Sequence, residues 1–295
     1  MHKSVLLHEI ISYLNIRDGL IYVDCTLGFG GHSFEIAKSL NNHGKLIGLD
    51  QDEETLEYAK KRLSEFNNCY LVHSNYIHLK EVLKKLNVEK ISGGVLLDLG
   101  INSYQLSSPD RGFSFQTDGP LDMRFDKNEP LTAYKVVNNY TEEDLSEIIF
   151  KYGEDRYSRR IAKSIVYRRK QTGHIKTTKE LANIILKCYP NNKYHKIHPA
   201  TRTFQALRIE VNKELDNLNN FLCFIQELLL PSARLCVISF HSLEDRIVKI
   251  FLKNNKDFKI LTKKPIIPSA DELKTNPRSR SAKLRVAEKN QHAEI

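Results

Sequence analysis

Three short apolar runs among the first hundred residues each end in an aspartate, at Asp24, Asp50 and Asp98. Including a fourth run that ends in a histidine, the strand-like segments cover residues 20–24, 45–50, 69–73 and 94–98. Helix-like segments separate these runs, at residues 32–40, 53–66 and 79–86. Strands that alternate with helices are typical of a parallel sheet joined by right-handed crossovers. The chain is therefore predicted to adopt an α/β fold.

The alternation breaks after the fourth strand-like run. Residues 107–128 are rich in Gly, Pro, Asp and Ser, which predicts an ordered loop. Residues 131–197 look all-helical, with capping-box patterns that begin at Thr141 and Thr177. Strand character returns at residues 234–240. We therefore predict an all-helical domain inserted into one α/β domain between its fourth and fifth strands.

The end of the chain completes the predicted sheet. Two extended runs, residues 258–263 and 282–287, predict an antiparallel hairpin on the sheet edge. The sheet is then parallel-dominated and seven-stranded. The predicted domains are an α/β domain and an inserted helical domain, with the boundaries 1–105 and 206–295 for the first and 106–205 for the second.

Composition limits the classes of protein that the chain can belong to. Its 295 residues are 41% hydrophobic and 27% charged, which is typical of soluble globular proteins. We find neither an apolar run of about 18 residues nor the apolar core of a signal peptide, so we expect a cytoplasmic protein. The five cysteines form no C-x-x-C pair, and three of them lie in apolar runs, which predicts buried, reduced thiols and no metal. The net charge of +9 fits a nucleic-acid-binding protein, although many basic proteins bind none.

A glycine loop follows the first strand and opens the first predicted helix. Its sequence, residues 24–33, is DCTLGFGGHS. A dinucleotide site requires G-x-G-x-x-G, and here Ser33 takes the place of the third glycine. Asp24 precedes the loop, and a carboxylate suits the cationic sulfonium and amino groups of S-adenosylmethionine better than a pyrophosphate. The loop therefore favours S-adenosylmethionine over NAD, and the remaining alternative is a purely structural turn.

Two residues after the next strands extend this predicted pocket. Asp50 lies 22 residues after Gly28 at the end of the second strand, where a carboxylate accepts hydrogen bonds from both ribose hydroxyls. That feature fits either cofactor. Tyr76, just past the third strand, is placed to lie against the adenine or, alternatively, to pack as an ordinary loop residue.

The segment after the fourth strand is the predicted substrate end. Methylation of an exocyclic amine needs an acceptor for the amine hydrogens, because the nitrogen lone pair is delocalised into the ring. Asp98 and Asn102 are candidate acceptors, and Tyr104 is a candidate stacking surface. The segment lacks the Pro-Pro-aromatic run found in many amino-methyltransferases. In the alternative interpretation, Asp98 only binds the methionine amino group.

Three groups of residues predict contacts with RNA. Arg111, Phe113 and Arg124 lie in a loop that clamps a flipped base or, alternatively, is held together by its own salt bridges. A second group, on a predicted helix without acids, consists of Arg156, Arg159 and Arg160, which form a cationic face or simply a solvated one. The third is His241, which leaves the fifth strand at the active edge.

Two local patterns receive simpler interpretations. His195 and His198 have metal-like spacing, but no carboxylate or cysteine joins them, so we predict no metal site. The serine, histidine and acids of residues 239–245 do not make a hydrolase triad, which is recognised by spatial geometry. We expect Ser242 to cap a helix there, with Asp245 reaching back.

Four stretches taken together resemble the bacterial RsmH (MraW) family of small-subunit (16S) ribosomal RNA cytosine N4-methyltransferases. They are DCTLGFGGHS at 24–33, LDLG at 97–100 with RGFSF at 111–115 and DGPLDMR at 118–124, HPATRTFQALRI at 198–209, and ISFHSLEDRIVK at 238–249. The end NPRSRSAKLR at 276–285 is also similar to that family. The resemblance extends over nearly the whole chain, and motifs of this length are highly specific.

The resemblance implies a class I (Rossmann-like) methyltransferase that uses S-adenosylmethionine. It implies methylation of a decoding-region cytidine on N4, giving N4-methylcytidine in the RNA of an assembled small ribosomal subunit. It also implies a cofactor pocket formed by Gly30, Gly31, His32, Asp50, Tyr76, Asp98 and Gln105. The family usually has Phe in place of Tyr76, and often Val-Ser-Ser at residues 101–103, which leaves a catalytic role for Asn102 open.

Two alternatives from other classes can be separated by experiment. A nicotinamide-dependent oxidoreductase would bind NAD and ignore S-adenosylmethionine. A non-catalytic assembly factor would bind small subunits without modifying them. A homodimer is compatible with the sequence, as is a monomer. We expect no membrane and no metal among the partners, and catalysis mainly by positioning and desolvation of the methyl donor.

Overall fold

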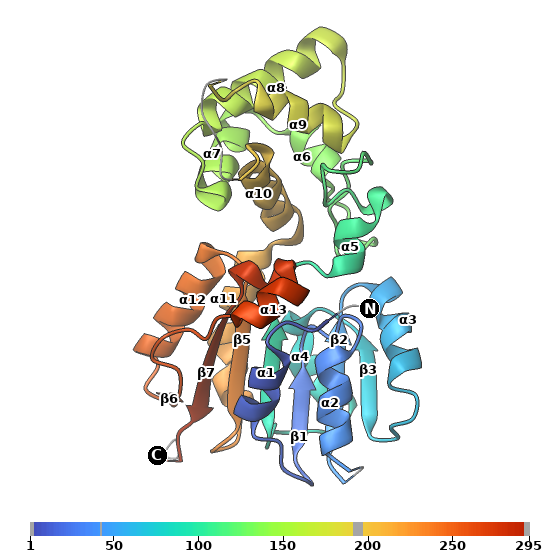
Figure 1. The fold of residues 1–295 in the computed structure, drawn as a ribbon, viewed down its shortest axis with the longest axis vertical. Coiled ribbons are helices and arrows are strands. Elements are labelled where there is room, and N and C mark those ends of the chain that lie inside the picture. The colour runs from blue at the N-terminus through green and yellow to red at the C-terminus, as the bar shows by residue number, and fades with distance from the viewer. Residues whose placement is uncertain (1–2, 42, 191–196, 292–295) are drawn as a thin grey trace. The chain divides into compact units, whose positions relative to one another are not determined.

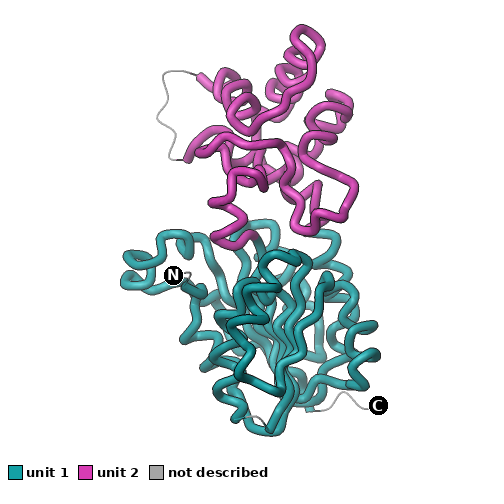
Figure 2. Tube along the Cα trace, turned by 90° about the vertical axis from the view of Figure 1, so that its right-hand side faces the viewer, with its two compact units in different colours: residues 1–100, 215–295 teal, residues 101–214 magenta. Residues whose placement is uncertain are grey.

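The computed structural model describes residues 3–41, 43–190 and 197–291, which form two compact units (Figure 2). Unit 1 comprises residues 1–100 and 215–295, and unit 2 comprises residues 101–214. Along the chain, the unit boundaries fall after residues 100 and 214, whereas the sequence predicts domain boundaries after residues 105 and 205. Within the described ranges, none of the helices combines the length and apolar character that crossing a bilayer would need.

Unit 1 is built on a seven-stranded sheet with the order β3-β2-β1-β4-β5-β7-β6 (Figure 1). The strands are β1 (Ile21–Asp24), β2 (Lys45–Asp50), β3 (Cys69–His73), β4 (Gly94–Asp98), β5 (Arg234–Ser239), β6 (Phe258–Ile260) and β7 (Lys283–Lys289). The first five strands pair in parallel, and β7 pairs antiparallel with both β5 and β6. The predicted parallel-dominated sheet of seven strands and its antiparallel hairpin are confirmed.

Helices cover both faces of this sheet. On one face lie α1 (Leu7–Leu14), α2 (Gly31–Ser39) and α3 (Glu53–Arg62), and on the other α4 (Leu79–Lys85), α11 (Glu214–Leu228) and α12 (Ser242–Asn254). Consecutive strand residues point to opposite faces, so Tyr22 packs with the first group of helices and Val23 with the second. Strands buried on both sides need apolar residues at every position. That need explains the uninterrupted apolar runs in the sequence.

Unit 2 contains the helices of the insertion and has a hydrophobic core of its own. They are α5 (Ser103–Ser107), α6 (Ala133–Asn139), α7 (Glu142–Gly153), α8 (Ser158–Thr172), α9 (Thr178–Leu186) and α10 (Ala200–Asn212), with the 3-10 helix η2 (Pro109–Arg111). Residues 112–131 form no regular helix or strand, which agrees with most of the loop predicted at 107–128; the start of that predicted loop instead contains the end of α5 and η2. The remaining short elements of the chain are η1 (Tyr76–His78), α13 (Ala270–Thr275) and η3 (Pro277–Ser281) in unit 1.

The helix ends test the predicted capping residues. Thr141 and Asp144 form the expected reciprocal capping box of α7. Thr177 caps α9 by accepting from the backbone N of Glu180. The prediction for α12 is wrong: its N-cap is His241, which forms a capping box with Glu244, and not Ser242 with Asp245.

Helix α1 was not predicted from the sequence. It is short, and the residue before it, Leu6, has a left-handed backbone with φ of 51° and offers no side-chain cap. Its position depends on the burial of Ile10 and Leu14 against the sheet. No local sequence pattern predicts that burial. The cysteines also differ in part from the expectation of buried thiols, because Cys223 is exposed.

Candidate active site

Three aspartates lie at the carboxyl edge of the sheet in unit 1. Asp24 ends β1, Asp50 ends β2 and Asp98 ends β4. Strand β1 lies between β2 and β4, so Asp24 is the central acid of the three. In open α/β sheets, ligands bind beyond the carboxyl ends of the strands. The three acid-terminated runs of the sequence therefore converge on one place.

The glycine loop between β1 and α2 links these strand ends. The backbone N of Gly28 donates to Asp50 Oδ2 at 2.6 Å, and Thr26 Oγ1 accepts from the backbone N of Asp98 at 2.6 Å. Gly28 and Gly30 have φ angles of 51° and 70°, in the left-handed region where glycine has no Cβ penalty. Gly30 is the N-cap of α2. The glycines thus allow a turn tight enough to hold the loop against two strands.

Asp24 is buried beneath this loop. Its carboxylate accepts from Ser33 Oγ at 2.7 Å and from the backbone N of Thr26 at 3.2 Å, and only 1% of the residue is exposed. Burial raises the pKa of Asp24 to about 6, although these hydrogen bonds oppose the shift. Ser33 stands where a dinucleotide motif would have its third glycine. In this structure its hydroxyl donates to Asp24.

Asp50 is held by backbone donors on both oxygens. Besides Gly28, the backbone N of Asp52 donates to Asp50 Oδ1 at 2.8 Å. Burial raises the pKa of Asp50 to about 6; the two backbone hydrogen bonds lower it, and the charges of Asp52 and Asp24 raise it further. Each carboxylate oxygen retains a second lone pair. Asp50 is thus fixed in position and can still accept hydrogen bonds.

Asp98 has the least compensated carboxylate of the three. Its Oδ1 is buried and has no hydrogen-bond partner in the described part of the chain, while its Oδ2 lies 3.8 Å from His32 Nδ1. Burial raises the pKa of Asp98 well above its usual range, and the charges of Asp24 and Glu244 add to the shift. A buried, unsatisfied acceptor is costly, and at a ligand site it indicates a missing donor.

His32 is oriented by the N-terminal segment. Its Nε2 lies 2.9 Å from the carbonyl O of Val5, which can only accept, so Nε2 carries the proton. The ring is buried, and its Nδ1 faces Asp98. The backbone N of Leu6 donates in turn to Glu272 Oε1 at 3.0 Å, which anchors this segment to α13. His32 thus occupies a defined position beside the carboxylate.

Tyr76 lies in the core on one side of the sheet. It is 7% exposed, and its ring packs edge-to-face against Phe221 with 5.4 Å between ring centroids. This geometry agrees with the alternative interpretation, in which Tyr76 packs as an ordinary residue of the fold. A contact with adenine stays a prediction for Tyr76.

The remaining predicted pocket residues belong to unit 2. Gln105 and Asn102 form the capping box of α5: Asn102 Oδ1 accepts from the backbone N of Gln105, and Gln105 Oε1 accepts from the backbone N of Asn102. Tyr104, on the same helix, is half-buried. Their roles toward cofactor and substrate stay predictions.

The side chains of the two loop arginines in unit 2 are hydrogen-bonded to other groups of the same loop. Arg111 is 1% exposed and donates to the carbonyl O atoms of Arg124 and Phe125. Arg124 pairs with Asp122 at 2.7 Å and also donates to backbone carbonyls. Phe113 stacks on Phe125 with centroids 5.4 Å apart. These contacts match the alternative of a loop held by its own interactions.

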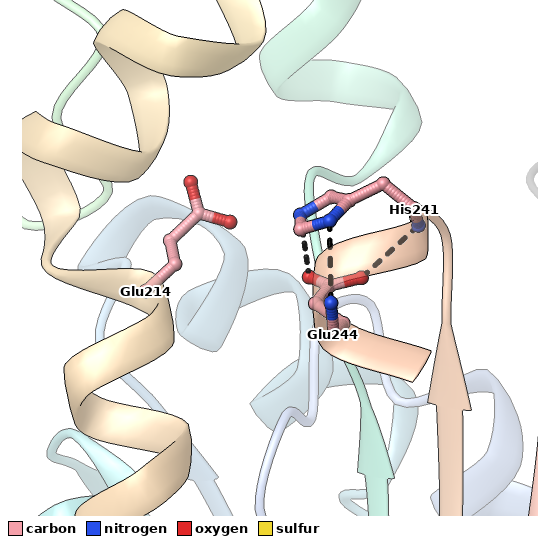
Figure 3. A group of neighbouring side chains, drawn as sticks. All are labelled: Glu214, His241 and Glu244. Atoms are coloured by element: carbon pink, nitrogen blue, oxygen red, sulfur yellow. Dashed lines mark hydrogen bonds and ion pairs between the residues drawn. The ribbon is translucent and has the colours of Figure 1, made fainter. Parts of the chain in front are cut away.

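His241 leaves β5 and starts α12. Its Nδ1 accepts from the backbone N of Glu244 at 3.4 Å, and its Nε2 lies 3.2 Å from Glu244 Oε1 (Figure 3). Glu244 Oε2 accepts from the backbone N of Phe240 at 2.8 Å. Glu214, also drawn in the figure, belongs to unit 2 and pairs with Arg208 at 2.8 Å. Of the two histidines with metal-like spacing, His195 lies outside the described residues.

Two acids of the site were absent from the predicted set. Asp24 is predicted only as the acid before the loop, although its charge raises the pKa values of both Asp50 and Asp98. Glu244 was not singled out, although it holds the start of α12 and raises the pKa of Asp98. The signal for Asp24 was the acid-terminated strand, and the signal for Glu244 was its capping-box spacing from His241.

The sheet order, with its antiparallel seventh strand, and the glycine loop after β1 define a class I (Rossmann-like) methyltransferase, whose methyl donor is S-adenosylmethionine. The chain belongs to the MraW methylase family, whose model matches residues 1–290. This assignment confirms the family resemblance of the sequence motifs. It also removes the support for a nicotinamide-dependent oxidoreductase.

The chain is similar over almost its full length to proteins named Ribosomal RNA small subunit methyltransferase H. One from Thermosipho melanesiensis is 53% identical over 290 residues, covering 98% of this chain and 97% of that protein. One from Clostridium botulinum is 48% identical over 306 residues, covering 98% of each. Among solved structures, an rRNA methylase from Streptococcus thermophilus has a TM-score of 0.44 at 14% identity, covering 99% of each chain.

Proposed function

We propose that this chain transfers the methyl group of S-adenosylmethionine to the exocyclic N4 of a cytidine in the decoding region of small-subunit ribosomal RNA, giving N4-methylcytidine. Membership of the MraW methylase family and the names of the relatives support a methyltransferase that acts on this RNA. The motif resemblance described above supports cytidine N4 as the target. Action in the cytoplasm, on the assembled small subunit, is part of the proposal.

The buried Oδ1 of Asp98 is the observation that best supports the cofactor site. The charged neighbours that act on the pKa values of Asp50 and Asp98 are themselves acids, and Asp24 is one of them for both. Such a site repels pyrophosphate and attracts a cation. S-adenosylmethionine brings a sulfonium and an ammonium group, so the residues present fit this donor. We assign Asp98 Oδ1 to the ammonium group.

The other pocket residues receive roles that follow from their geometry. Asp50, held by the backbone N of Gly28, is proposed to accept from the ribose hydroxyls with its remaining lone pairs. Gly30 and Gly31, at the start of α2, stay predicted cofactor contacts, because a Cβ on Gly31 would meet Ser4 Oγ at 2.0 Å and one on Gly30 would meet Leu63 at 3.3 Å. His32 is proposed to line the pocket beside Asp98, in the position that its Nε2 contact with the carbonyl O of Val5 fixes.

The reaction depends more on the positioning of the methyl donor and the cytosine N4 than on strong acid–base chemistry. The N4 lone pair forms the new N–C bond as the S–C bond of the sulfonium breaks, and S-adenosylhomocysteine leaves. One proton of N4 must also depart, and an oxygen that accepts the amine hydrogens makes the lone pair available. Asn102 stays a predicted acceptor, as does Asp98 in addition to its proposed cofactor role. Alignment of the methyl group with N4 would supply most of the acceleration.

For RNA binding, the helical face of unit 2 is better supported than the loop. Arg159 and Arg160 on α8 are exposed, and so is Arg156, which precedes the helix instead of lying on it as predicted; we propose that all three contact the RNA backbone. Because Arg111 and Arg124 are occupied, we propose that they shape the loop. Phe113, Tyr104 and His241 stay predicted substrate contacts.

The proposed function is tested by methyl transfer in vitro with labelled S-adenosylmethionine, using small ribosomal subunits and protein-free 16S RNA as separate substrates. Digestion to nucleosides and mass spectrometry should identify N4-methylcytidine at one decoding-region position. Asp98→Asn should abolish labelling. A methyl group on the cytosine C5 or on a ribose would refute the assignment, as would wild-type protein that binds subunits and transfers nothing.

A further inference from the structure

One face of helix α8 has an exposed tyrosine within a row of cations. Arg160, Lys163, Tyr167 and Lys170 follow one another at intervals of three and four residues, which places them on the same face of the helix. All four are exposed, and Tyr167 exposes 66% of its surface. The opposite face of α8 is buried in the core of unit 2.

The cations of this face are not used by the fold. Two other arginines of α8 have structural partners: Arg168 pairs with Glu180 at 2.7 Å, and Arg169 donates to the carbonyl O of Val137 at 2.7 Å. Within the part of the chain that the structure describes, Arg160 and Lys163 make no side-chain hydrogen bond or ion pair. The sequence shows only a basic run. It does not distinguish the arginines that have structural partners from the cations that have none in the described chain.

Exposure of one aromatic ring is not informative by itself, since single apolar side chains are common on protein surfaces. Phe150 on the adjacent helix α7 illustrates this, because it exposes 64% of its surface. Its charged neighbour at helical spacing on α7 is the exposed acid Glu147. Tyr167 differs because its neighbours at helical spacing are Lys163 and Lys170. The combination of ring and cations, and not the ring alone, indicates a ligand.

We propose that this face of α8 docks a single-stranded or loop segment of the ribosomal RNA, with a base stacked on Tyr167 and phosphates on Arg160, Lys163 and Lys170. Aromatic platforms flanked by cations are the usual surface for unpaired nucleic acid, because the ring binds the base and the cations bind the backbone. At a rise of about 1.5 Å per residue, the row from Arg160 to Lys170 spans about 15 Å. The proposal rests on the proposed function, which supplies ribosomal RNA as the partner.

A kinetic comparison tests the docking surface with small subunits as substrate. Tyr167→Ala should raise KM about tenfold, within the range for loss of one stacked base. It should leave kcat and the Kd of S-adenosylmethionine unchanged. Tyr167→Phe keeps the stacking ring and should behave as wild type. Phe150→Ala is the matched control and should also behave as wild type. An unchanged KM for Tyr167→Ala, or an equal rise for Phe150→Ala, would overturn the proposal.

A fluorescence titration tests stacking directly. The chain contains no tryptophan, so Tyr167→Trp introduces a single reporter that can still stack. Protein-free small-subunit ribosomal RNA should quench its emission, and Phe150→Trp should not respond. Lys163→Ala in the Tyr167→Trp background should shift the quenching to higher RNA concentration. No quenching, or equal quenching at both positions, contradicts base stacking.

The two readouts together identify the partner and separate this proposal from the proposed function. If Tyr167→Ala raises KM for subunits but RNA quenches nothing, the face contacts a ribosomal protein and the RNA proposal falls. The titration requires no methyl transfer. A protein that transfers nothing therefore refutes the proposed function, while the titration still decides whether α8 docks RNA.

Discussion

The two units of this protein contain opposite arrangements of charge. At the sheet edge of unit 1, three carboxylates are wholly or partly buried and have raised pKa values, and one oxygen of Asp98 has no partner among the described residues. On helix α8 of unit 2, cations such as Arg160 and Lys163 are exposed and unpaired within the described chain. The overall charge of +9 hides this division.

The difference indicates what each surface binds. A buried charge is destabilising unless a partner compensates it, so the acids of unit 1 require a small cation that is enclosed with them. Exposed cations cost the fold little, and they gain affinity for a polyanion by releasing its counterions. Ligand binding at the acids of unit 1 should therefore depend on pH and hardly on salt. RNA binding at the cations of unit 2 should depend on salt and hardly on pH.

The largest expected effect comes from Asp98→Asn. Removal of the charge proposed to face the methionine ammonium should weaken S-adenosylmethionine binding about 100-fold, equivalent to about 2.7 kcal/mol. The ligand-free protein should melt at the same temperature or higher, because the raised pKa shows that ionised Asp98 is unfavourable in the fold. Calorimetric titration and thermal melts measure the two quantities.

A control from the same unit is Asp271→Asn, since the Asp271 side chain is 90% exposed. It should change neither affinity nor melting temperature. If Asp98→Asn bound S-adenosylmethionine as tightly as wild type, the proposed site would be wrong. If its melting temperature fell sharply, Asp98 would be a structural residue.

The second prediction concerns the cations of unit 2. Replacing Arg156, Arg159 and Arg160 together by Ala should lower affinity for protein-free ribosomal RNA without affecting S-adenosylmethionine binding. With a slope of about 0.7 per phosphate contact, three lost contacts should reduce the salt-induced loss of affinity between about 50 and about 200 mM by about 20-fold. Filter binding across that salt range measures the slope, and an unchanged slope would contradict the contacts.

The third prediction is a pH dependence confined to unit 1. The pKa values of Asp24 and Asp50 are raised to about 6 in the ligand-free protein, so both are largely neutral below that pH. Because a cationic ligand prefers the ionised forms, affinity for S-adenosylmethionine should rise about tenfold per coupled carboxylate from about pH 5 to about pH 7. S-adenosylhomocysteine, which lacks the sulfonium charge, should show a smaller rise.

The same raised pKa values determine the sign of the effect on stability. Between the ordinary pKa of 3.8 and about 6, the folded ligand-free protein binds more protons at these groups than the unfolded chain. The contribution of Asp24 and Asp50 to the free energy of unfolding should therefore fall as pH rises through that window. Asp24→Asn should abolish part of this fall, as measured by urea unfolding, and an unchanged pH profile would refute the assignment.

The smallest expected effect separates stability from binding. Thr141→Ala removes the capping box of α7 in unit 2 and should lower the free energy of unfolding by about 1 kcal/mol. Thr141→Ser retains the cap and serves as the control. Affinity for S-adenosylmethionine should not change, because Thr141 lies in unit 2, outside the sheet-edge site. A parallel loss of that affinity would show that the two units are coupled.

Much of unit 1 was predictable because its signals are local. Residues 45–50, 69–73 and 94–98 were predicted as strands with the bounds that the structure has. Apolar runs of that length between helical segments have few other solutions in an α/β fold. The acid at each strand end is also read directly from the sequence. The antiparallel hairpin and the helical insertion followed from the same reasoning.

The errors concern side chains whose partners are not set by local pattern. The sequence predicted Ser242 as the cap of α12, whereas the structure has His241 at the N-cap, in a reciprocal capping box with Glu244. The sequence likewise left two interpretations of Arg111 open, and the backbone carbonyls that accept from it are 13 and 14 residues away in the chain. Periodicity gives no information about contacts at such separations.

The sequence by itself determined the strands, the glycine turn and the acids at the strand ends, because each depends on residues close together in the chain. Only the tertiary structure decided which acid is left without a partner. Asp98 faces His32, and Val5 orients His32, so this arrangement exists only once the N-terminal segment has packed onto the loop. Burial and hydrogen-bond satisfaction are properties of the assembled core, and they distinguish carboxylates that the sequence presents as equivalent.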